Sequence, residues 1–376
     1  MAPIKVGIIG YGFATKCFHL PFILPNPDLQ VYAFLQRAEA PAKGSPVSGW
    51  GHCTVDFPEA KHYRTADDFF SDSQIDLVIV ATPNHEEFAE RGLNTGKHVV
   101  CEKPFTSTSQ AADKLITLAK SKGKILTVFQ NRRQDSDFRT LRHLVEQKAL
   151  GDIKEAELHY DIPSPSWISG WTHKEYSAGQ GMLFGIGSHT IDQALVLFGK
   201  PHSVTAFLRS NRGVESNVDD TFTIILQYTG AKSNLLVTIK TGIVTPLKDQ
   251  FKYFVRGSKG SYIKFGTDPQ EMKAIAAPGQ AATAEDYGQE DESIWGTLTT
   301  PTEYDAKSQK LDSDSRLYVG KYPSLPGWYR GYYENVAQAI RGNAKVEVDP
   351  ASARDGIKII ELARESHAKG ATVLFS

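Results

Sequence analysis

The sequence is poor in cysteine and has no excess of charge of either sign. Its three cysteines, Cys17, Cys53 and Cys101, are an odd number at wide spacing in a chain of 376 residues. That pattern argues against a disulfide framework and fits a reducing compartment. Forty-two Lys and Arg residues against 43 Asp and Glu residues give a net charge of −1. This balance offers no broad basic field for nucleic acid or an anionic membrane surface, so we expect a small-molecule partner.

The sequence also lacks long apolar runs. No stretch approaches the roughly 18 apolar residues needed to cross a bilayer. The first ten residues read as a strand rather than as a signal peptide, because no cleavage-site pattern follows the short apolar run. We therefore expect a cytoplasmic protein. With 40% hydrophobic and 23% charged residues, the chain has a globular composition, and its length predicts two or three domains.

Short apolar runs alternate with amphipathic stretches in the N-terminal third of the chain. This rhythm predicts a doubly wound parallel sheet of the Rossmann type over residues 1–130. Helices are expected from Pro83-Asn84 to Gly96 and from a cap at Ser107 or Ser109 to Gly123. Residues 38–63 have no clear period and predict a loop with some short helix. The expected strands are Ile4–Ile9, Leu29–Leu35, Ile75–Ala81, His98–Cys101 and Ile125–Phe129.

The rhythm changes after residue 130 to strand-like runs separated by turn signals. It predicts an α+β domain over residues 131–376 with a mostly antiparallel open sheet. Residues 268–325 look polar and irregular. Helices are expected at Asp137–Lys148, Ser188–Phe198, Trp328–Arg341 and Ala351–Lys369. The expected strands are Ile153–Ile162, Ser203–Arg209, Thr221–Tyr228, Asn234–Ile243, Phe251–Arg256 and Ser261–Phe265.

A glycine loop follows the first predicted strand. The segment Gly10-Tyr11-Gly12-Phe13-Ala14 matches the dinucleotide fingerprint at its first two glycines, and Thr15 stands where the third usually occurs. Gly10 permits the tight turn, and Gly12 lets main-chain amides approach a pyrophosphate at the helix N-terminus. Because the loop lies between a strand and a helix, we expect it to bind a dinucleotide rather than to form only a structural turn.

The end of the second strand indicates which dinucleotide is bound. An acidic residue there usually holds the ribose 2′-hydroxyl of NAD, but this chain has Leu35-Gln36-Arg37. Arg37 can pair with a 2′-phosphate and stack on adenine, so we predict NADP, with NAD as the alternative. A solvated surface arginine is the other interpretation.

Two further strand ends carry candidate residues. Thr82-Pro83-Asn84 and Glu102-Lys103-Pro104 follow predicted parallel strands, where such sheets place their ligands. A lysine buried beside a nicotinamide would have a lowered pKa and could exchange a proton with substrate. The alternative interpretation of Lys103 is a solvated loop lysine.

These motifs together resemble the Gfo/Idh/MocA oxidoreductases over nearly the whole chain. The resemblance rests on the glycine loop, the segment from Ala81 to Asn84, the segment from Gly96 to Pro104, Asn131-Arg132-Arg133, and Gly187-Ser-His-Thr-Ile-Asp192. Residues 129–138 and 187–193 are most similar to the NADP-preferring scyllo-inositol dehydrogenase-like branch. The resemblance implies a Rossmann domain, a second domain whose open sheet forms homodimer or homotetramer contacts, and substrate between nicotinamide and sheet.

The resemblance also implies roles for individual residues. Lys103 would contact the reacting hydroxyl and assist proton transfer, and His189 would share that role because an imidazole titrates near neutral pH. A core or capping histidine is the alternative. Asp192 lies three residues on, so it could orient the imidazole, bind a substrate hydroxyl or complement the helix dipole.

Other polar and aromatic residues complete the predicted site. Asn131 and Arg132 could donate to a polyhydroxylated ligand, unless they form only surface pairs. Trp171 lies in a Pro/Gly/Ser-rich loop and could stack on a sugar face, unless it only packs within the loop. The histidines, among them His52 and His62, and the cysteines show no ligand spacing, so we expect no metal.

Two departures from the family pattern keep more than one function open. Gly185 stands four residues before His189, where many members carry an aspartate that takes part in proton transfer, and His85 cannot be matched to the histidine often found after Ala81-Thr-Pro. The leading prediction is an NADP-dependent oxidoreductase acting on a secondary hydroxyl or carbonyl of a cyclitol, sugar or related polyol. A non-catalytic NADP-binding sensor and a redox-neutral lyase, epimerase or glycosidase are the alternatives.

Overall fold

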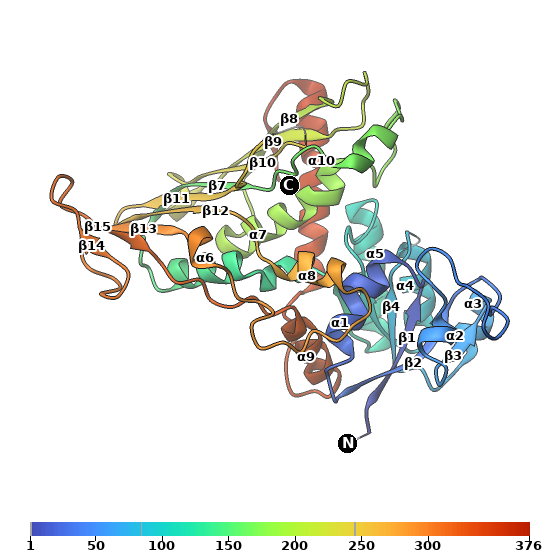
Figure 1. The fold of residues 1–376 in the computed structure, drawn as a ribbon. Coiled ribbons are helices and arrows are strands. Elements are labelled where there is room, and N and C mark those ends of the chain that lie inside the picture. The colour runs from blue at the N-terminus through green and yellow to red at the C-terminus, as the bar shows by residue number, and fades with distance from the viewer. Residues whose placement is uncertain (1, 84, 244–245) are drawn as a thin grey trace.

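The computed structural model describes residues 2–83, 85–243 and 246–376, which form two domains side by side (Figure 1). Asn84, a predicted cofactor residue, lies outside the described residues. None of the described helices is long and apolar enough to span a membrane.

The first domain contains a six-stranded parallel sheet in the order β3-β2-β1-β4-β5-β6. The predicted bounds of three strands are confirmed, whereas β4 and β6 are shorter than predicted. The edge strand β3 was not predicted, because three residues of mixed polarity carry no periodic signal. The strands are β1 (Ile4–Ile9), β2 (Leu29–Leu35), β3 (Lys61–Tyr63), β4 (Leu77–Val80), β5 (His98–Cys101) and β6 (Leu126–Val128).

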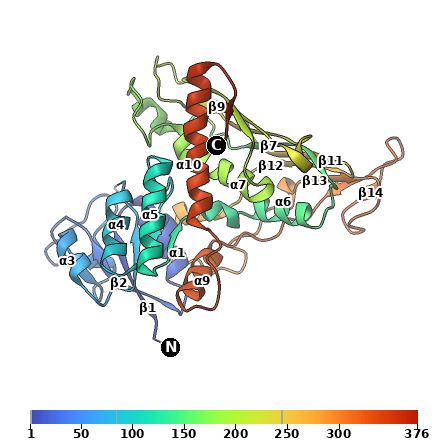
Figure 2. The same cartoon turned by 180° about the vertical axis from the view of Figure 1, so that it is seen from behind.

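Helices cover both faces of this sheet. The helices α3 (Ala66–Ser71), α4 (His85–Asn94) and α5 (Ser109–Lys122) lie on one side (Figure 2), and α1 (Leu20–Ile23) lies on the other. The short helix α2 (Cys53–Asp56) falls in the segment predicted as loop with some helix. Helix α5 ends at Gly123 as predicted, with φ +60°, but its cap is Thr108, whose hydroxyl accepts from the amide of Ala111 at 3.2 Å.

The second domain contains a ten-stranded sheet in the order β14-β15-β13-β12-β11-β7-β10-β9-β8-β16. Every neighbouring pair is antiparallel except β7 and β10, which confirms the mostly antiparallel prediction. The strands are β7 (Ile153–His159), β8 (Ser203–Arg209), β9 (Thr221–Gln227), β10 (Leu236–Thr241), β11 (Phe251–Gly257), β12 (Ser261–Phe265), β13 (Thr297–Thr300), β14 (Lys310–Leu311), β15 (Tyr318–Lys321) and β16 (Val373–Leu374).

The segment 268–325 is more regular than its composition suggested. It contains α8 (Gln270–Ala276) and the strands β13, β14 and β15, so the expectation of an irregular segment is wrong there. These strands are two to four residues long, and pairing with the edge of the large sheet rather than local pattern defines them.

The helices α6 (Ser136–Glu146), α7 (Ser188–Phe198) and α10 (Pro350–Lys369) lie along one face of the large sheet (Figures 1 and 2). Helix α10 also contacts α5 and β6 of the first domain. Its start is fixed by Asp349, whose carboxylate accepts from the amide of Ala351 at 2.9 Å. The helix α9 (Tyr329–Ile340) returns to pack on α1, so the C-terminal chain holds both domains together.

Candidate active site

The glycine loop has the geometry that a dinucleotide requires. Gly10 has φ +96°, and a Cβ there would lie 2.6 Å from the Thr82 side chain. A Cβ at Gly12 would meet no atom within 4 Å, so open space faces that residue. The Thr15 hydroxyl donates to the Gly10 carbonyl at 2.9 Å and holds the turn against the start of the helical segment that contains α1.

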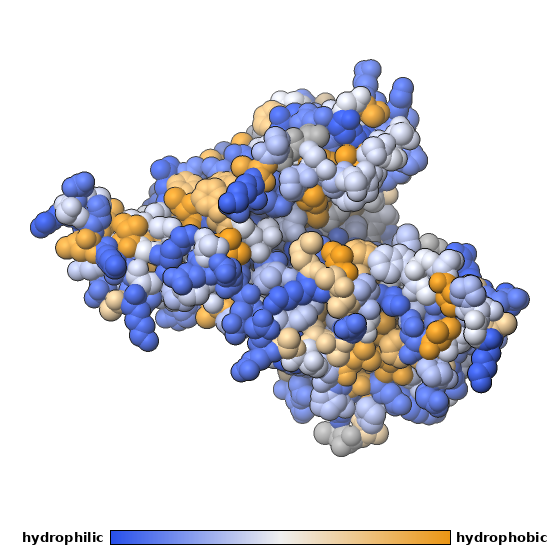
Figure 3. Space-filling view, in the orientation of Figure 1, coloured by the Kyte–Doolittle hydropathy of each residue, from blue (hydrophilic) through white to orange (hydrophobic). Residues whose placement is uncertain are grey.

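A cavity of about 740 Å³ extends from this loop between the two domains. The space-filling view shows the surface hollowed beside the projecting 163–181 segment (Figure 3). The volume of the cavity lies within the range of sites that hold a drug-sized ligand or cofactor. The predicted cofactor residues on its wall are Phe13, Ala14, Thr82, Pro83, Glu102 and Lys103, and residues 178–179 of the second domain close it.

The carboxylate of the predicted cofactor residue Glu102 mainly contacts other residues of the protein. One carboxylate oxygen accepts from the Lys103 amide at 2.9 Å, and the other lies 3.2 Å from Nε2 of His19. Nδ1 of His19 lies 2.6 Å from the hydroxyl of Tyr333 in α9. Although burial opposes ionisation, His19 and Lys103 hold the pKa of Glu102 below its ordinary value. This network fixes the end of β5.

Lys103 lies where two cavities meet. Its ammonium group donates to the main-chain carbonyl of Gly185 at 3.0 Å. Burial lowers the pKa of Lys103, partly opposed by the charge of Glu102. Near neutral pH, a larger fraction of Lys103 is therefore present as the neutral amine than is the case for an ordinary lysine.

A second cavity of about 500 Å³ lies on the other side of Lys103, in the second domain. Trp171 lines it, and the centroid of its ring lies 5.3 Å from that of Trp167; contact of Trp171 with a sugar face stays a prediction. Arg212 also lines it, but its guanidinium donates to the Trp171 carbonyl at 2.9 Å and pairs with Asp220 at 3.0 Å, so it supports the wall. The other apolar lining residues are Pro104, Ile162, Met182, Ile186 and Val218.

His189 lies at the second position of α7 and is 3% exposed. Its Nδ1 lies 3.2 Å from the side-chain oxygen of Gln130, which can only accept, so Nδ1 carries the proton. Burial, with Lys103 and other nearby cations, holds the pKa of His189 well below its ordinary value. The ring is thus neutral. Among the described residues, His189 does not belong to the walls of the two cavities, so its role in proton transfer stays a prediction.

Asp192 has a different partner from the one its spacing suggested. Both of its oxygens accept from the Arg133 guanidinium, at 2.7 and 2.6 Å, and both residues are buried. The Arg133 guanidinium also donates to the main-chain carbonyl of Glu347 at 2.9 Å. The structure therefore uses Asp192 to fasten α7 to the segment after β6, and not to orient His189.

The predicted substrate residues Asn131 and Arg132 are both 6% exposed. The Arg132 guanidinium is hydrogen-bonded to Glu271 and stacks 4.5 Å from the centroid of the Tyr160 ring. Among the described residues, neither Asn131 nor Arg132 belongs to the walls of the two cavities. The sequence predicts donors to a polyhydroxylated ligand here, but the structure places Arg132 in a buried ionic cluster.

The remaining predicted cofactor residues are Tyr11, within the glycine loop, and Arg37, beyond β2. Arg37 is exposed immediately beyond β2, and its main-chain carbonyl accepts from Arg64 at 3.3 Å. The buried Tyr11 donates to Asp56 at 2.6 Å, so its hydroxyl supports the loop. His85 lies at the start of α4 and donates from Nδ1 to the Pro104 carbonyl at 2.7 Å, which supports the segment after Lys103.

Two family models cover most of the chain. The model described as an oxidoreductase family with an NAD-binding Rossmann fold matches residues 4–130, and the GFO/IDH/MocA C-terminal domain matches residues 138–263. The chain belongs to the Gfo/Idh/MocA family. The protein is therefore an NAD(P)-dependent oxidoreductase, and the predicted fold class, a Rossmann domain followed by an α+β domain, is confirmed.

Relatives within the Gfo/Idh/MocA family align over the full length. An uncharacterized oxidoreductase of Schizosaccharomyces pombe is 35% identical, with 99% of this chain and 100% of the relative covered. The Bacillus subtilis scyllo-inositol 2-dehydrogenase (NADP(+)) IolW is 33% identical, with 99% and 96% covered. The solved structure of the Bacillus subtilis oxidoreductase yvaA has a TM-score of 0.86 at 31% identity, with 99% and 98% covered.

The two glycines give a matched pair of substitutions. Gly10→Ala introduces a Cβ at positive φ against Thr82, so we expect lower thermal stability as well as weaker cofactor binding. Gly12→Ala has room in the free protein but narrows the approach of a pyrophosphate. We expect an unchanged melting temperature and at least a tenfold higher NADPH dissociation constant by calorimetry. Equal NADPH affinity in Gly12→Ala and the parent would contradict the loop's assignment.

Proposed function

We propose that this protein transfers a hydride between NADP and a secondary hydroxyl or carbonyl of a cyclic polyol such as a cyclitol or sugar. The position of Lys103 at the junction of the two cavities carries the proposal. The larger cavity begins at the glycine loop and suits the cofactor. The smaller one has the size of a ring-shaped substrate.

Lys103 exchanges with the substrate the proton that moves together with the hydride. In the oxidative direction its neutral amine accepts the hydroxyl proton, and in the reductive direction its ammonium group donates a proton to the carbonyl oxygen. The bound nicotinamide supplies or accepts the hydride. The Gly185 carbonyl, 3.0 Å from Nζ, orients the amine in both directions.

Aromatic side chains in the smaller cavity favour a ring-shaped substrate. Trp167 and Trp171 offer flat apolar surfaces against which the C–H face of a cyclitol or sugar can pack. His173 and Gln180 of the same wall offer polar groups for hydroxyls. The relative IolW, which is named for scyllo-inositol and NADP, supports this substrate class and cofactor.

Arg37 supports the choice of NADP. It is exposed at the carboxyl end of β2, where the adenosine ribose lies in dinucleotide folds. A guanidinium there attracts a 2′-phosphate, whereas a carboxylate would repel it.

The three cysteines are buried and unpaired, which fits our proposal of a cytoplasmic location.

We also propose that the protein forms a homodimer or homotetramer through the open face of its large sheet. The helices α6, α7 and α10 lie along the other face (Figure 2). Three apolar side chains on the open face, Phe207, Ile263 and Phe265, are 54%, 36% and 47% exposed. Ile263 and Phe265 lie on β12 and Phe207 on β8, so exposed apolar groups occur at both ends of this face, and we infer that it is an association surface.

Substitution of Lys103 tests the proton-transfer role. We expect Lys103→Met to lose about 10²- to 10⁴-fold in kcat, the usual contribution of a general acid or base. In the parent, oxidation should rise with pH through a pKa below that of an ordinary lysine, because the neutral amine is required, and reduction should fall through the same pKa. The exposed Lys154→Met is the control. Full turnover of Lys103→Met with a cyclitol or sugar would exclude this role.

Substitution of Arg37 tests the cofactor preference. A charged hydrogen bond contributes about 1.5–3 kcal/mol, so Arg37→Gln should lower kcat/KM for NADP by about 10- to 100-fold and change that for NAD little. Arg142→Gln, on α6 of the second domain, should leave both values unchanged. An unaltered NADP to NAD ratio in Arg37→Gln would show that Arg37 is only a surface residue.

Substitution of Phe265 tests the assembly. Sedimentation velocity should show a dimer or tetramer for the parent and a smaller species for Phe265→Glu, because a charge on the open sheet face opposes its burial. Met272→Glu on α8, where the parent residue is 67% exposed, should leave the assembly intact. A monomeric parent, or the same assembly in both variants, would rule out this interface.

A further inference from the structure

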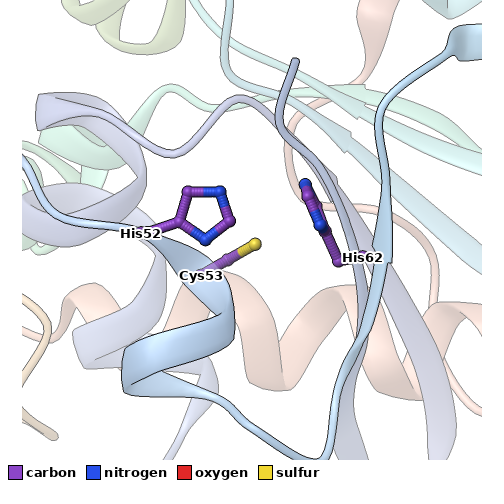
Figure 4. A group of neighbouring side chains, drawn as sticks. All are labelled: His52, Cys53 and His62. Atoms are coloured by element: carbon purple, nitrogen blue, oxygen red, sulfur yellow. The ribbon is translucent and has the colours of Figure 1, made fainter. Parts of the chain in front are cut away.

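A group of metal-ligating side chains lies outside both cavities. His52, Cys53 and His62 each offer one ligand atom, and these atoms all lie within 4.8 Å of one another. Figure 4 shows the Cys53 sulfur directed between the two imidazole rings. His52 and Cys53 are 3% and 1% exposed. The expectation of no metal rests on sequence spacing alone, which cannot show that the fold brings His62 beside His52 and Cys53.

Two elements of the first domain bring the ligands together. His52 and Cys53 stand at the start of α2, whereas His62 lies in the middle of β3, paired with Phe34 of β2. Gln36 connects the two elements. Its side-chain oxygen accepts from the Cys53 amide at 2.9 Å, and its main-chain carbonyl accepts from Nε2 of His62 at 2.8 Å.

The hydrogen bonds leave a ligand nitrogen available on His62. Nε2 of His62 donates to a carbonyl, so Nδ1 of the neutral ring offers its lone pair. Nδ1 of His52 accepts from the Thr54 amide at 3.3 Å and lies 2.8 Å from the Thr54 hydroxyl, while its Nε2 lies 3.4 Å from the Ala38 carbonyl. A cation bound at Nε2 therefore requires the ring proton to move to Nδ1, where the Thr54 hydroxyl can accept it. Metal-bound imidazoles commonly use their second nitrogen in such a bond to a carbonyl or hydroxyl group.

We propose that His52, Cys53 and His62 form a binding site for a thiophilic d¹⁰ cation, with Zn²⁺ as its simplest occupant. Thiolate and imidazole ligands favour such ions over Mg²⁺ or Ca²⁺, which prefer oxygen. On binding, a metal–sulfur bond forms as the Cys53 thiol releases its proton to solvent. A water molecule would complete a four-coordinate ion.

The geometry needs only a small adjustment. Zinc bonds of about 2.3 Å to sulfur and about 2.0 Å to nitrogen separate tetrahedral ligand atoms by roughly 3.5 Å. Side-chain rotation therefore has to bring the widest pair roughly 1 Å closer. A bound cation would join α2 to β3 next to Gln36, the neighbour of Arg37.

Cobalt(II) provides a direct readout, because its bond to a thiolate produces a charge-transfer absorption that carboxylate or imidazole ligands alone do not give. The full chain, treated with a chelator and then dialysed, is titrated with Co²⁺ and afterwards with Zn²⁺. We expect saturation at one Co²⁺ per chain, a thiolate–cobalt band, and displacement of that band by Zn²⁺. Absence of the band at saturating Co²⁺ would overturn the proposal.

Matched variants identify the ligands. Cys53→Ser should abolish the band and His62→Gln should weaken Co²⁺ binding at least tenfold, whereas Cys17→Ser, which removes another buried thiol, should retain both. Zn²⁺ should raise the melting temperature of the parent and of Cys17→Ser but not of His62→Gln, which separates ligand loss from misfolding. A band that survives in Cys53→Ser or is lost in Cys17→Ser would refute the site.

Discussion

The arrangement of the active site depends on one buried contact, between the carboxylate of Glu102 and the imidazole of His19. Glu102 ends β5, His19 precedes α1, and Tyr333 of α9 holds the other nitrogen of the imidazole. A buried carboxylate is tolerated only when it is paired and hydrogen-bonded. Since Glu102 also accepts from the Lys103 amide, this contact fixes the main chain from which Lys103 extends, and it joins the C-terminal helices to the cofactor domain.

The partner of Lys103 is a main-chain carbonyl rather than a carboxylate. A carboxylate beside Nζ would raise the pKa of Lys103. The Gly185 carbonyl carries no charge, so burial is the main influence and lowers this pKa. A Cβ at Gly185 would meet no atom within 4 Å, so packing does not require glycine there. The absence of a carboxylate at this position leaves the proposed proton exchange mainly to Lys103.

The sequence predicted those elements and residues whose patterns lie within a few neighbouring positions of the chain. The apolar runs of β1, β2 and β5, the turn at Gly10 and the position of Lys103 at a strand end all follow from patterns within a few residues. The contacts of Asp192 and Arg132 could not be predicted, since their partners Arg133 and Glu271 approach only through packing. The Gly185 carbonyl carries no side-chain signal, and the short strand β3, which completes the His52–Cys53–His62 group, has no periodicity.

The measurement that tests the central claim most directly is transfer of a label. With the hydride position of NADPH deuterated and the carbonyl form of a cyclitol or sugar as substrate, the account predicts one deuterium on the new secondary carbon for each NADPH oxidised. It predicts near-complete loss of this transfer in Lys103→Met. Product that forms without deuterium and without net oxidation of NADPH would contradict the account and assign the two cavities to a redox-neutral reaction.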